Sequence, residues 1–326
     1  GDPVGIGPEI IAKALCDPQV RRCCQPVIYG DVKRLHMGAK SSCVPIRFSG
    51  IPSVEHIHAG QDGVPVIDPA SLDAGKLTWA TPTAACGAAV VAYLNAATDD
   101  AMAGRIAAMA TAPINKRVLK MAGIHLHGHT EMLARRTGTS RFAMMLAGER
   151  LKVVLTTIHV PIKQVSRNLS TPGIATIIEL THQALRTRFG IATPRIAVAG
   201  LNPHAGESGL FGDEEERIIQ PAVEQAAAQG MAVSGPHPPD TIFFTAAQGA
   251  CDAVVAMYHD QGLGPFKMIH FTDGVNTTLG LPIIRTSVDH GTAYDIAGTG
   301  GASERSMAAA IIMAASQARW ASRTCT

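Results

Sequence analysis

Three runs of apolar residues each end in a histidine. The runs cover residues 151–158, 195–203 and 252–258. They lead into His159, His204 and His259. A short apolar run closed by polar and glycine residues is typical of a buried strand, whose carboxyl end lies where open α/β sheets bind ligands. Three imidazoles at one edge could hold a zinc-like metal ion and leave one position open, whereas a single such histidine is more often structural.

The rest of the chain alternates between expected strands and helices, which predicts the α/β class. An apolar run over residues 142–147 is expected to form a hairpin with the run before His159, around Gly148–Arg150. Helices are expected at residues 83–100, 162–168, 172–189, 213–229 and 303–321. A Gly-rich loop over Gly1–Glu9 enters a helix with Pro8 near its first turn, so it could hold an anion or form a tight turn.

The sequence Gly128-His129-Thr130-Glu131 precedes another helical run. Thr130 is placed to cap the amino terminus of that helix, and His129 would then point from the preceding loop. A hydroxyl and an imidazole beside free helix N–H groups make a cradle for phosphate or carboxylate. Capping alone by Thr130 is the alternative.

The stretch from Met257 to Gly300 is rich in polar groups and too rich in Gly and Pro to be one helix. Lys267, Asn276 and Arg285 follow His259 at expected loop and strand positions. Two cations and an amide can pair with a phosphate dianion or a carboxylate, although each alone could be an ordinary surface charge. Asp240, at the end of a proline-rich loop, is either a helix cap or a site acid.

These groups suggest a redox reaction. A metal ion held by neutral histidines would polarise a hydroxyl oxygen and then the carbonyl formed from it. Because the chain itself has no hydride acceptor, a nicotinamide cofactor is the natural candidate. The turn-rich stretch from His290 to Gly298 could hold the adenosine of that cofactor.

Composition narrows the class of protein. The chain has 326 residues, 46% hydrophobic and only 4% aromatic, which suits a helix-and-sheet enzyme and argues against disorder. The net charge of +2 and the lack of basic runs make nucleic acid an unexpected partner. Seven cysteines without a Cys-x-x-Cys pair predict neither disulfides nor a cysteine zinc site, so we expect a cytoplasmic protein. No apolar stretch is long enough to predict a membrane span.

Several motifs in order along the chain resemble those of the 4-hydroxythreonine-4-phosphate dehydrogenase family, which serves pyridoxal phosphate biosynthesis. They are GDPVGIGPEI, TAPINK, GHTE, LNPHAGE, PPDT, YHDQG and RTSVDHGTAYDIAG. Two of them, GIGPE and HGTAYDIAG, are also similar to motifs of the isocitrate and isopropylmalate dehydrogenases. The resemblance implies a two-domain α/β/α fold with the active site in the cleft between domains. The expected domains are residues 1–128 with 286–326, on the cofactor side, and residues 129–285, with the metal, substrate and dimer interface.

The resemblance also implies roles for individual residues. A divalent metal, zinc with magnesium or cobalt as alternatives, would be held by His159, His204 and His259 near the interface of a homodimer. The phosphorylated substrate would be held by His129, Thr130, Lys267, Asn276 and Arg285. Catalysis would involve Asp240, Lys267 and His129. NAD or NADP would be bordered by His290, Gly291, Thr292, Ala293 and Asp295.

The implied reaction oxidises the C3 hydroxyl of 4-phosphohydroxy-L-threonine and then releases CO2 to give 3-amino-2-oxopropyl phosphate. Close relatives in the resemblance act on 4-phospho-D-threonate or D-erythronate, or on cis-dihydrodiols of aromatic acids. Two further alternatives are a metal-dependent hydrolase or lyase, which would turn over without NAD, and a binding protein without catalysis.

Overall fold

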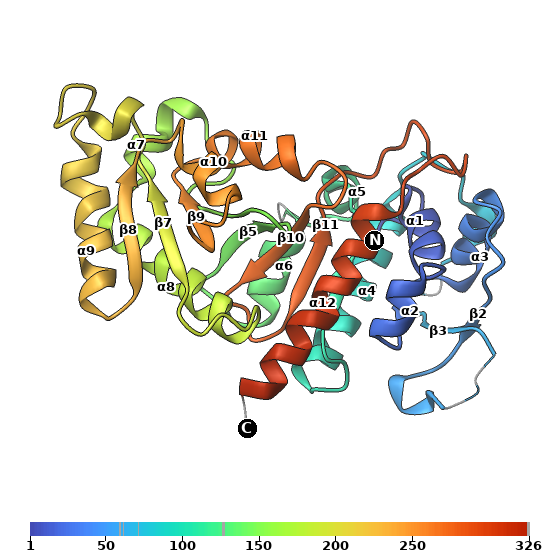
Figure 1. Ribbon diagram of the computed structural model, residues 1–326. Helices are drawn as coiled ribbons and strands as arrows, with labels where there is room; N and C mark the ends of the chain where they lie inside the picture. The colour runs from blue at the N-terminus through green and yellow to red at the C-terminus, as the bar shows by residue number, and fades with distance from the viewer. Residues whose placement is uncertain (59, 61, 71, 126–127, 325–326) are drawn as a thin grey trace. The chain divides into compact units, whose positions relative to one another are not determined.

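The computed structural model describes residues 1–58, 60, 62–70, 72–125 and 128–324, and its mixture of helices and parallel strands confirms the predicted α/β class (Figure 1). The chain divides into two compact units. Unit 1 comprises Gly1–Ser140 and Pro282–Ser316, and unit 2 comprises Arg141–Leu281 and Gln317–Thr326. The first division lies beyond the expected boundary after residue 128 because helix α6 (His129–Arg136) packs against α4 (Ala84–Met102) of unit 1.

Unit 1 contains short parallel strands. Strands β1 (Ile28–Tyr29), β3 (Val64–Ile67) and β2 (Phe48–Gly50) lie side by side in that order. Strand β4 (Met109–Thr111) pairs in parallel with β11 (Arg285–Val288). The other helices of this unit are α1 (Gly7–Ala14), α2 (Pro18–Cys23), α3 (Val32–Ser41), α5 (Lys116–Met121) and the first part of α12 (Arg305–Thr324). Single 3-10 turns occur at Val54–His56 and Ala74–Lys76.

The core of unit 1 joins segments that are distant in sequence. Ile10 of α1 and Leu35 of α3 are buried together with Val288 of β11 and Met307 of α12. Helices α1 and α3 approach so closely that a Cβ atom at Gly38 would lie 2.6 Å from the carbonyl carbon of Pro8. A glycine is therefore required at this crossing.

Unit 2 is built on a mixed sheet whose strands lie in the order β10-β5-β6-β9-β7-β8. Strand β5 is antiparallel to β10 and β6, and the other pairs are parallel. The bounds are β5 (Ala143–Ala147), β6 (Lys152–Leu155), β7 (Arg195–Ala199), β8 (Ala232–His237), β9 (Ala253–Ala256) and β10 (Val275–Leu279). The predicted hairpin of β5 and β6 is confirmed.

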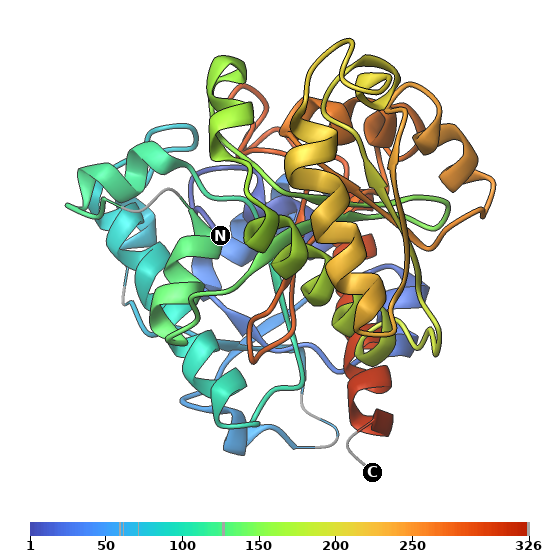
Figure 2. The ribbon, with the colours of Figure 1, turned by 90° about the vertical axis from the view of Figure 1, so that its left-hand side faces the viewer.

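Helices cover both faces of the unit 2 sheet. On one face Val153 of β6 and Val254 of β9 pack against α10 (Ile242–Ala247) and α11 (His259–Ile269). On the other, α8 (Thr171–Thr187) contacts β6, β7 and β9, and α9 (Gln220–Ala228) runs beside α8 (Figure 2). Helix α7 (Val165–Asn168) follows a 3-10 turn at Ile162–Gln164, and a π-helical turn at Glu215–Ile219 precedes α9.

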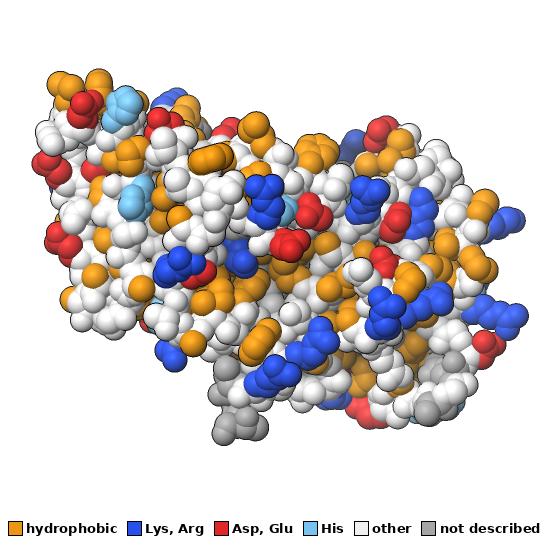
Figure 3. Space-filling model, in the orientation of Figure 1, with side chains coloured by type: hydrophobic (Ala, Val, Ile, Leu, Met, Phe, Trp, Pro, Cys, Tyr) orange, Lys and Arg blue, Asp and Glu red, His pale blue; other side chains and the backbone are white. Residues whose placement is uncertain are grey.

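Unit 2 also exposes large apolar side chains. They include Ile162, Leu210, Phe244, Met268 and Phe271, of which Met268 is 89% and Phe271 81% exposed. Figure 3 shows hydrophobic side chains at the surface over the part of unit 2 that carries α7, α10 and α11.

Among the described residues, none of the helices combines the length and hydrophobicity needed to cross a bilayer.

Candidate functional site

Two of the three predicted metal ligands lie together in unit 2. Strands β6 and β9 are parallel neighbours, and the backbone N–H and the hydroxyl of Thr157 both donate to the carbonyl of Met257. His159 and His259 each come two residues after this bonded pair, and their ring centres are 5.9 Å apart. Zinc binds histidine nitrogens at about 2.0 to 2.1 Å, so two imidazoles that share one ion must lie next to each other. The spacing of this pair therefore fits a shared ion.

The hydrogen bonding of His259 also suits a metal ligand. Its Nδ1 lies 2.6 Å from Oδ1 of Asp260. Metal-binding histidines commonly use one ring nitrogen to bond a carboxylate, which fixes the tautomer and leaves the other nitrogen for the ion. In His259 that other nitrogen is Nε2.

His204 is not gathered with the other two histidines. It lies in the turn Pro203–Gly206 after β7, with a left-handed backbone at φ 52°, and its ring packs against Phe211. Within residues 1–58, 60, 62–70, 72–125 and 128–324 there is no group of three His, Cys, Asp or Glu side chains able to hold a metal ion. The three-histidine site thus stays a prediction. Within one chain, two of its three histidines, His159 and His259, lie together.

A buried carboxylate holds the loop that carries His204. Oε1 of Glu215 accepts the backbone N–H groups of Leu201 and Asn202, each at 2.7 Å, and Oε2 accepts the side-chain amide of Asn202 at 2.9 Å. Glu215 is only 3% exposed and lies in the π-helical turn, a feature that is frequent at functional sites. Sequence reasoning missed Glu215, because the acidic run at residues 213–216 reads as an exposed helix face.

The sequence analysis also gave no role to Gln261 of the YHDQG motif. Its amide oxygen accepts the backbone N–H of Met257 at 2.7 Å, and its amide nitrogen donates to the carbonyl of Gly200 at 2.7 Å. Gln261 therefore ties the carboxyl ends of β9 and β7 together. The only signal in the sequence was its position directly after the histidine and aspartate of that motif.

In unit 1 a buried cation lies close to His129. Arg285 on β11 is 3% exposed, and its Nε and Nη2 donate to the hydroxyl of Thr111 at 3.1 and 2.8 Å. Burial lowers the pKa of Arg285 to about 9. Burial and the nearby charge of Arg285 hold the pKa of His129 well below its usual range, so the ring is neutral at pH 7. A neutral imidazole beside a guanidinium is suited to binding an anion.

Helix α6 begins at His129 itself. Gly128 is the N-cap residue at φ 150°, and no side chain of a described residue makes a capping hydrogen bond at this end. The expectation that Thr130 is the N-cap is therefore wrong, because Gly128 adopts a conformation that starts the helix earlier and places Thr130 in the first turn. The uncapped N–H groups of that turn remain suited to an anion.

Three other predicted site residues lie in unit 2. Asn276 is on β10, and its buried Oδ1 has no hydrogen-bond partner within the part of the chain that the structure describes. Lys267 is half-buried on α11 rather than in the expected loop, because the helix continues through Gly264 and Pro265. Asp240 is exposed. It does not cap α10, whose N-cap residue is Thr241, so its role as a site acid stays a prediction.

The predicted cofactor residues belong to a segment without helix or strand between β11 and α12. His290, Gly291 and Asp295 are exposed, and Ala293 is left-handed at φ 40°. Thr292 is instead buried, and its carbonyl accepts the backbone N–H of Ile6 at 3.0 Å. One side of this segment is therefore fixed inside unit 1, while the other faces solvent.

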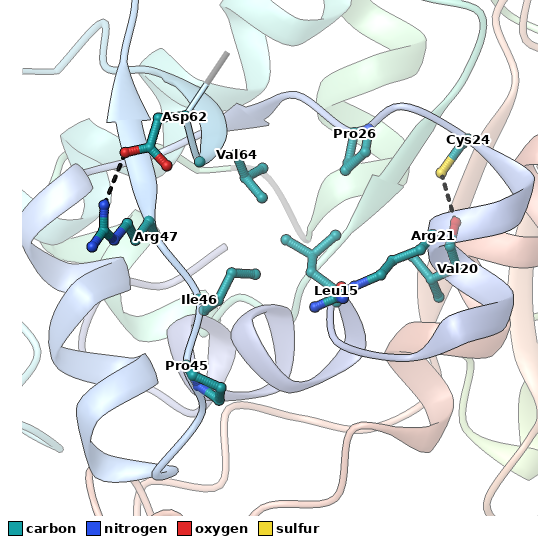
Figure 4. Close-up of a pocket in the computed structure, with 11 residues that line it drawn as sticks. Leu15, Val20, Arg21, Cys24, Pro26, Pro45, Ile46, Arg47, Asp62 and Val64 are labelled. Atoms are coloured by element: carbon teal, nitrogen blue, oxygen red, sulfur yellow. Dashed lines mark hydrogen bonds and ion pairs between the residues drawn. The ribbon is translucent and has the colours of Figure 1, made fainter. Parts of the chain in front are cut away.

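A separate pocket of about 430 Å³ in unit 1 contains none of the predicted site residues (Figure 4). Its walls are largely aliphatic, with Leu15, Ile46 and Val64 among them. Its two arginines already make bonds: Arg21 donates to the carbonyl of Leu15, and Arg47 pairs with Asp62 at 2.9 Å. The groups suited to chemistry lie elsewhere.

We expect His129 to make stability depend on pH. The folded-state pKa is below that of an unfolded histidine, so the unfolded chain binds more protons, and the free energy of unfolding falls as the pH drops through about 6.5. The midpoint of thermal unfolding, measured from about pH 7.5 to pH 5 in phosphate-free buffer, should therefore fall more steeply in the wild type than in His129→Gln. Equal slopes would contradict the lowered pKa of His129.

Comparison with known proteins places the chain in a family. Residues 22–314 match the family described as Pyridoxal phosphate biosynthetic protein PdxA. A 4-hydroxythreonine-4-phosphate dehydrogenase from Desulforapulum autotrophicum is 56% identical over 321 residues, covering 98% of this chain and 94% of that protein. A D-threonate 4-phosphate dehydrogenase from Cupriavidus necator is 46% identical over 317 residues, covering 95% of this chain and 93% of that protein.

Solved structures agree. The crystal structure of 4-hydroxythreonine-4-phosphate dehydrogenase from Klebsiella pneumoniae matches with a TM-score of 0.87 at 44% identity, covering 97% of this chain and 96% of that chain. The fold and much of the sequence are thus shared with proteins named as dehydrogenases. The resemblance drawn from the motifs is confirmed, and the chain belongs to the family of the pyridoxal phosphate biosynthetic protein PdxA.

Proposed function

We propose that this protein oxidises 4-phosphohydroxy-L-threonine at C3 with NAD or NADP and releases CO2 to form 3-amino-2-oxopropyl phosphate, in pyridoxine biosynthesis in the cytoplasm. The observation that supports the proposal is a cluster of groups in unit 1 that is suited to binding an anion. There the buried guanidinium of Arg285 lies beside the neutral ring of His129 at the uncapped start of α6. A substrate with a phosphate group matches this combination of a buried positive charge and the amino terminus of a helix.

Each predicted substrate residue then has a definite task. Arg285 and His129 hold the phosphate, together with the Thr130 hydroxyl and the first-turn N–H groups of α6. The orphaned Oδ1 of Asn276 accepts a hydrogen bond from a hydroxyl or ammonium group of the substrate, which removes the cost of leaving that oxygen buried and unpaired. Lys267 moves the proton of the C3 hydroxyl, and Asp240 assists as an acid.

Two bound groups complete the chemistry. His159, His259 and His204 would hold a divalent ion, zinc with magnesium or cobalt as alternatives, which would supply Lewis-acid polarisation of the C3 oxygen. His290, Gly291 and Asp295 would border NAD or NADP, which would supply the hydride acceptor. The hydroxyl proton and the C3 hydride leave together to give a β-keto acid. Its bond to the carboxylate then breaks, CO2 departs, and the electron pair is protonated at C2.

We further propose that a second copy of the chain supplies His204. One chain brings His159 and His259 together but does not gather His204 with them. The His204 ring lies against Phe211, which is itself exposed, and unit 2 exposes further apolar side chains such as Met268 and Phe271. Large apolar side chains gathered on one unit are typical of a surface that a partner covers. A homodimer would cover these side chains and complete the ligand set.

The test is NADH formation from 4-phosphohydroxy-L-threonine beside 4-phospho-D-threonate, with and without EDTA. We expect turnover of the first substrate that EDTA abolishes and added zinc restores. Turnover that needs no NAD would instead indicate a hydrolase or lyase, and phosphate binding without turnover of either substrate would indicate a binding protein.

The second candidate substrate is 4-phospho-D-threonate, which the relative from Cupriavidus necator favours by its name. The two substrates share the phosphate and the C3 hydroxyl and differ at C2, where one carries an ammonium group and the other a hydroxyl. A higher kcat/KM for 4-phospho-D-threonate would keep the mechanism and move the protein to sugar-acid catabolism. If neither substrate gives NADH, the same assay should be run with cis-dihydrodiols of aromatic acids.

A further inference from the structure

We propose that Asp2 and Glu9 of the amino-terminal loop are positioning residues for the cofactor, because they fix the inner side of the segment 290–302. This inference rests on the proposed role of that segment in binding NAD or NADP. The segment has no helix or strand of its own, so its conformation depends on bonds to its neighbours. All of the contacts below lie within unit 1.

Glu9 makes the central contact. It is fully buried on α1, and its two carboxylate oxygens accept the backbone N–H groups of Gly298 and Gly300, the latter at 3.2 Å. One helix turn further along α1, the ammonium group of Lys13 donates to the carbonyls of Gly300 and Ala302 at 2.6 and 2.7 Å. An acidic and a basic side chain of one helix thus bind opposite groups of the same stretch of backbone.

Asp2 makes the second contact. Its Oδ2 accepts the hydroxyl of Tyr294 at 2.5 Å, and its Oδ1 accepts the backbone N–H of Val4 at 3.0 Å. The amino-terminal loop and the segment also pack closely together, because a Cβ atom at Gly5 would lie 2.9 Å from the Cβ of Thr292. Asp2 is fully buried, so its carboxylate bonds only groups that the fold provides.

The amino-terminal loop is itself anchored from behind. Nε of the buried Arg34 donates to the carbonyl of Pro3 at 2.8 Å, and the Arg34 guanidinium stacks on Trp79, 3.7 Å from the ring centre. The Trp79 ring also lies against Gly298, where a Cβ atom would come within 2.4 Å of it. The loop is therefore a fixed support for the segment.

The outer side of the segment is left for a ligand. His290, Gly291 and Asp295 are exposed, and apart from its own chain neighbours no described residue has a heavy atom within 4 Å of the Cβ position of Gly291. This open backbone next to an imidazole and a carboxylate is a suitable border for an adenosine. Its geometry is set by the inner contacts, because inner and outer residues alternate within a few positions of each other.

The test is Glu9→Gln. The amide keeps one acceptor but turns a donor toward a backbone N–H, so the segment should loosen. We expect faster amide hydrogen exchange across residues 290–302 without cofactor, and a rise of about tenfold or more in the NADH dissociation constant and in KM for NAD. KM for the phosphorylated substrate should not change. Tyr294→Phe, which removes one hydroxyl, should give a smaller change in the same direction and serves if Glu9→Gln folds poorly.

Glu55→Gln is the matched control, because it makes the same chemical change on an exposed carboxylate of unit 1 with no bond to the segment. Unchanged exchange in both variants would overturn the inference, and so would faster exchange with an unchanged NADH dissociation constant. If the wild type binds neither NADH nor NADPH, the proposed function fails together with the cofactor role. The exchange experiment separates these failures, because it needs no cofactor.

Discussion

Mixed dimers made from a His159→Ala chain and a His204→Ala chain should recover about half of the wild-type activity per dimer, although each parent homodimer is inactive. The expectation follows from the proposal that one chain supplies two ligands, the neighbouring His159 and His259, and that its partner supplies the third. In such a mixed dimer one of the two sites keeps all three histidines. Loss of a ligand should lower the activity of each homodimer by more than the roughly 10- to 100-fold typical of losing a hydrogen-bond partner of a ligand.

The control for this experiment is a mixed dimer of His159→Ala and His259→Ala chains. Both changes remove ligands that one chain provides, so neither site is complete and no activity should return. Purification through two different affinity tags isolates the mixed species, and bound zinc measured on the same samples should follow activity. Recovery in the control pair, or none in the first pair, would contradict the proposed sharing of ligands.

Arg285→Lys should raise KM for the phosphorylated substrate by about 100-fold, because lysine keeps the charge but loses the two-pronged geometry. Each lost hydrogen bond to a charged group is worth about 1.5 to 3 kcal/mol. The shorter lysine side chain also removes the two hydrogen bonds that the hydroxyl of Thr111 now accepts from Arg285. The inhibition constant of inorganic phosphate, as a competitive inhibitor, should rise in parallel with KM for the substrate. A parallel rise would identify the phosphate as the group that Arg285 binds.

Arg188→Lys is the matched control. Burial lowers the pKa of Arg188 to about 10, and its guanidinium donates to the carbonyls of Thr278 and Leu281 at 3.0 and 2.6 Å. Its replacement should reduce stability and leave KM for the substrate unchanged. If both variants raise KM equally, the effect of Arg285 is structural and its role in binding the phosphate is wrong.

The strands that carry site residues could be predicted from the sequence because they are short, apolar and closed by polar residues. β6 and β9 end just before His159 and His259, as expected. The helix α11 was harder, since Gly262, Gly264 and Pro265 argue against it. A Cβ atom at Gly262 would lie 2.6 Å from the Val153 side chain, so that glycine is there for close packing on β6. Such a tertiary reason is invisible in a local pattern.

The buried polar residues that shape the loops could not be predicted either. Glu215 and Glu9 both appear as helix carboxylates, which normally face water, yet each is buried and binds backbone N–H groups of a distant loop. Their role depends on which loop the fold brings against them. The cap of α6 was predicted at the wrong residue. The pattern indicated Thr130, but the backbone conformation of Gly128 makes that glycine the N-cap residue.

The pairing of β4 with β11 has a consequence for how the protein is made. Thr111 and Arg285, which are bonded across this pair, are 174 positions apart, and nearly the whole of unit 2 is encoded between them. A ribosome therefore releases the central stretch of unit 2 before β4 can meet its partner. Unit 2 has the opportunity to fold while unit 1 is still incomplete, and β4 must wait with an unsatisfied edge. During that interval the unpaired edge of β4 makes the nascent chain prone to aggregation.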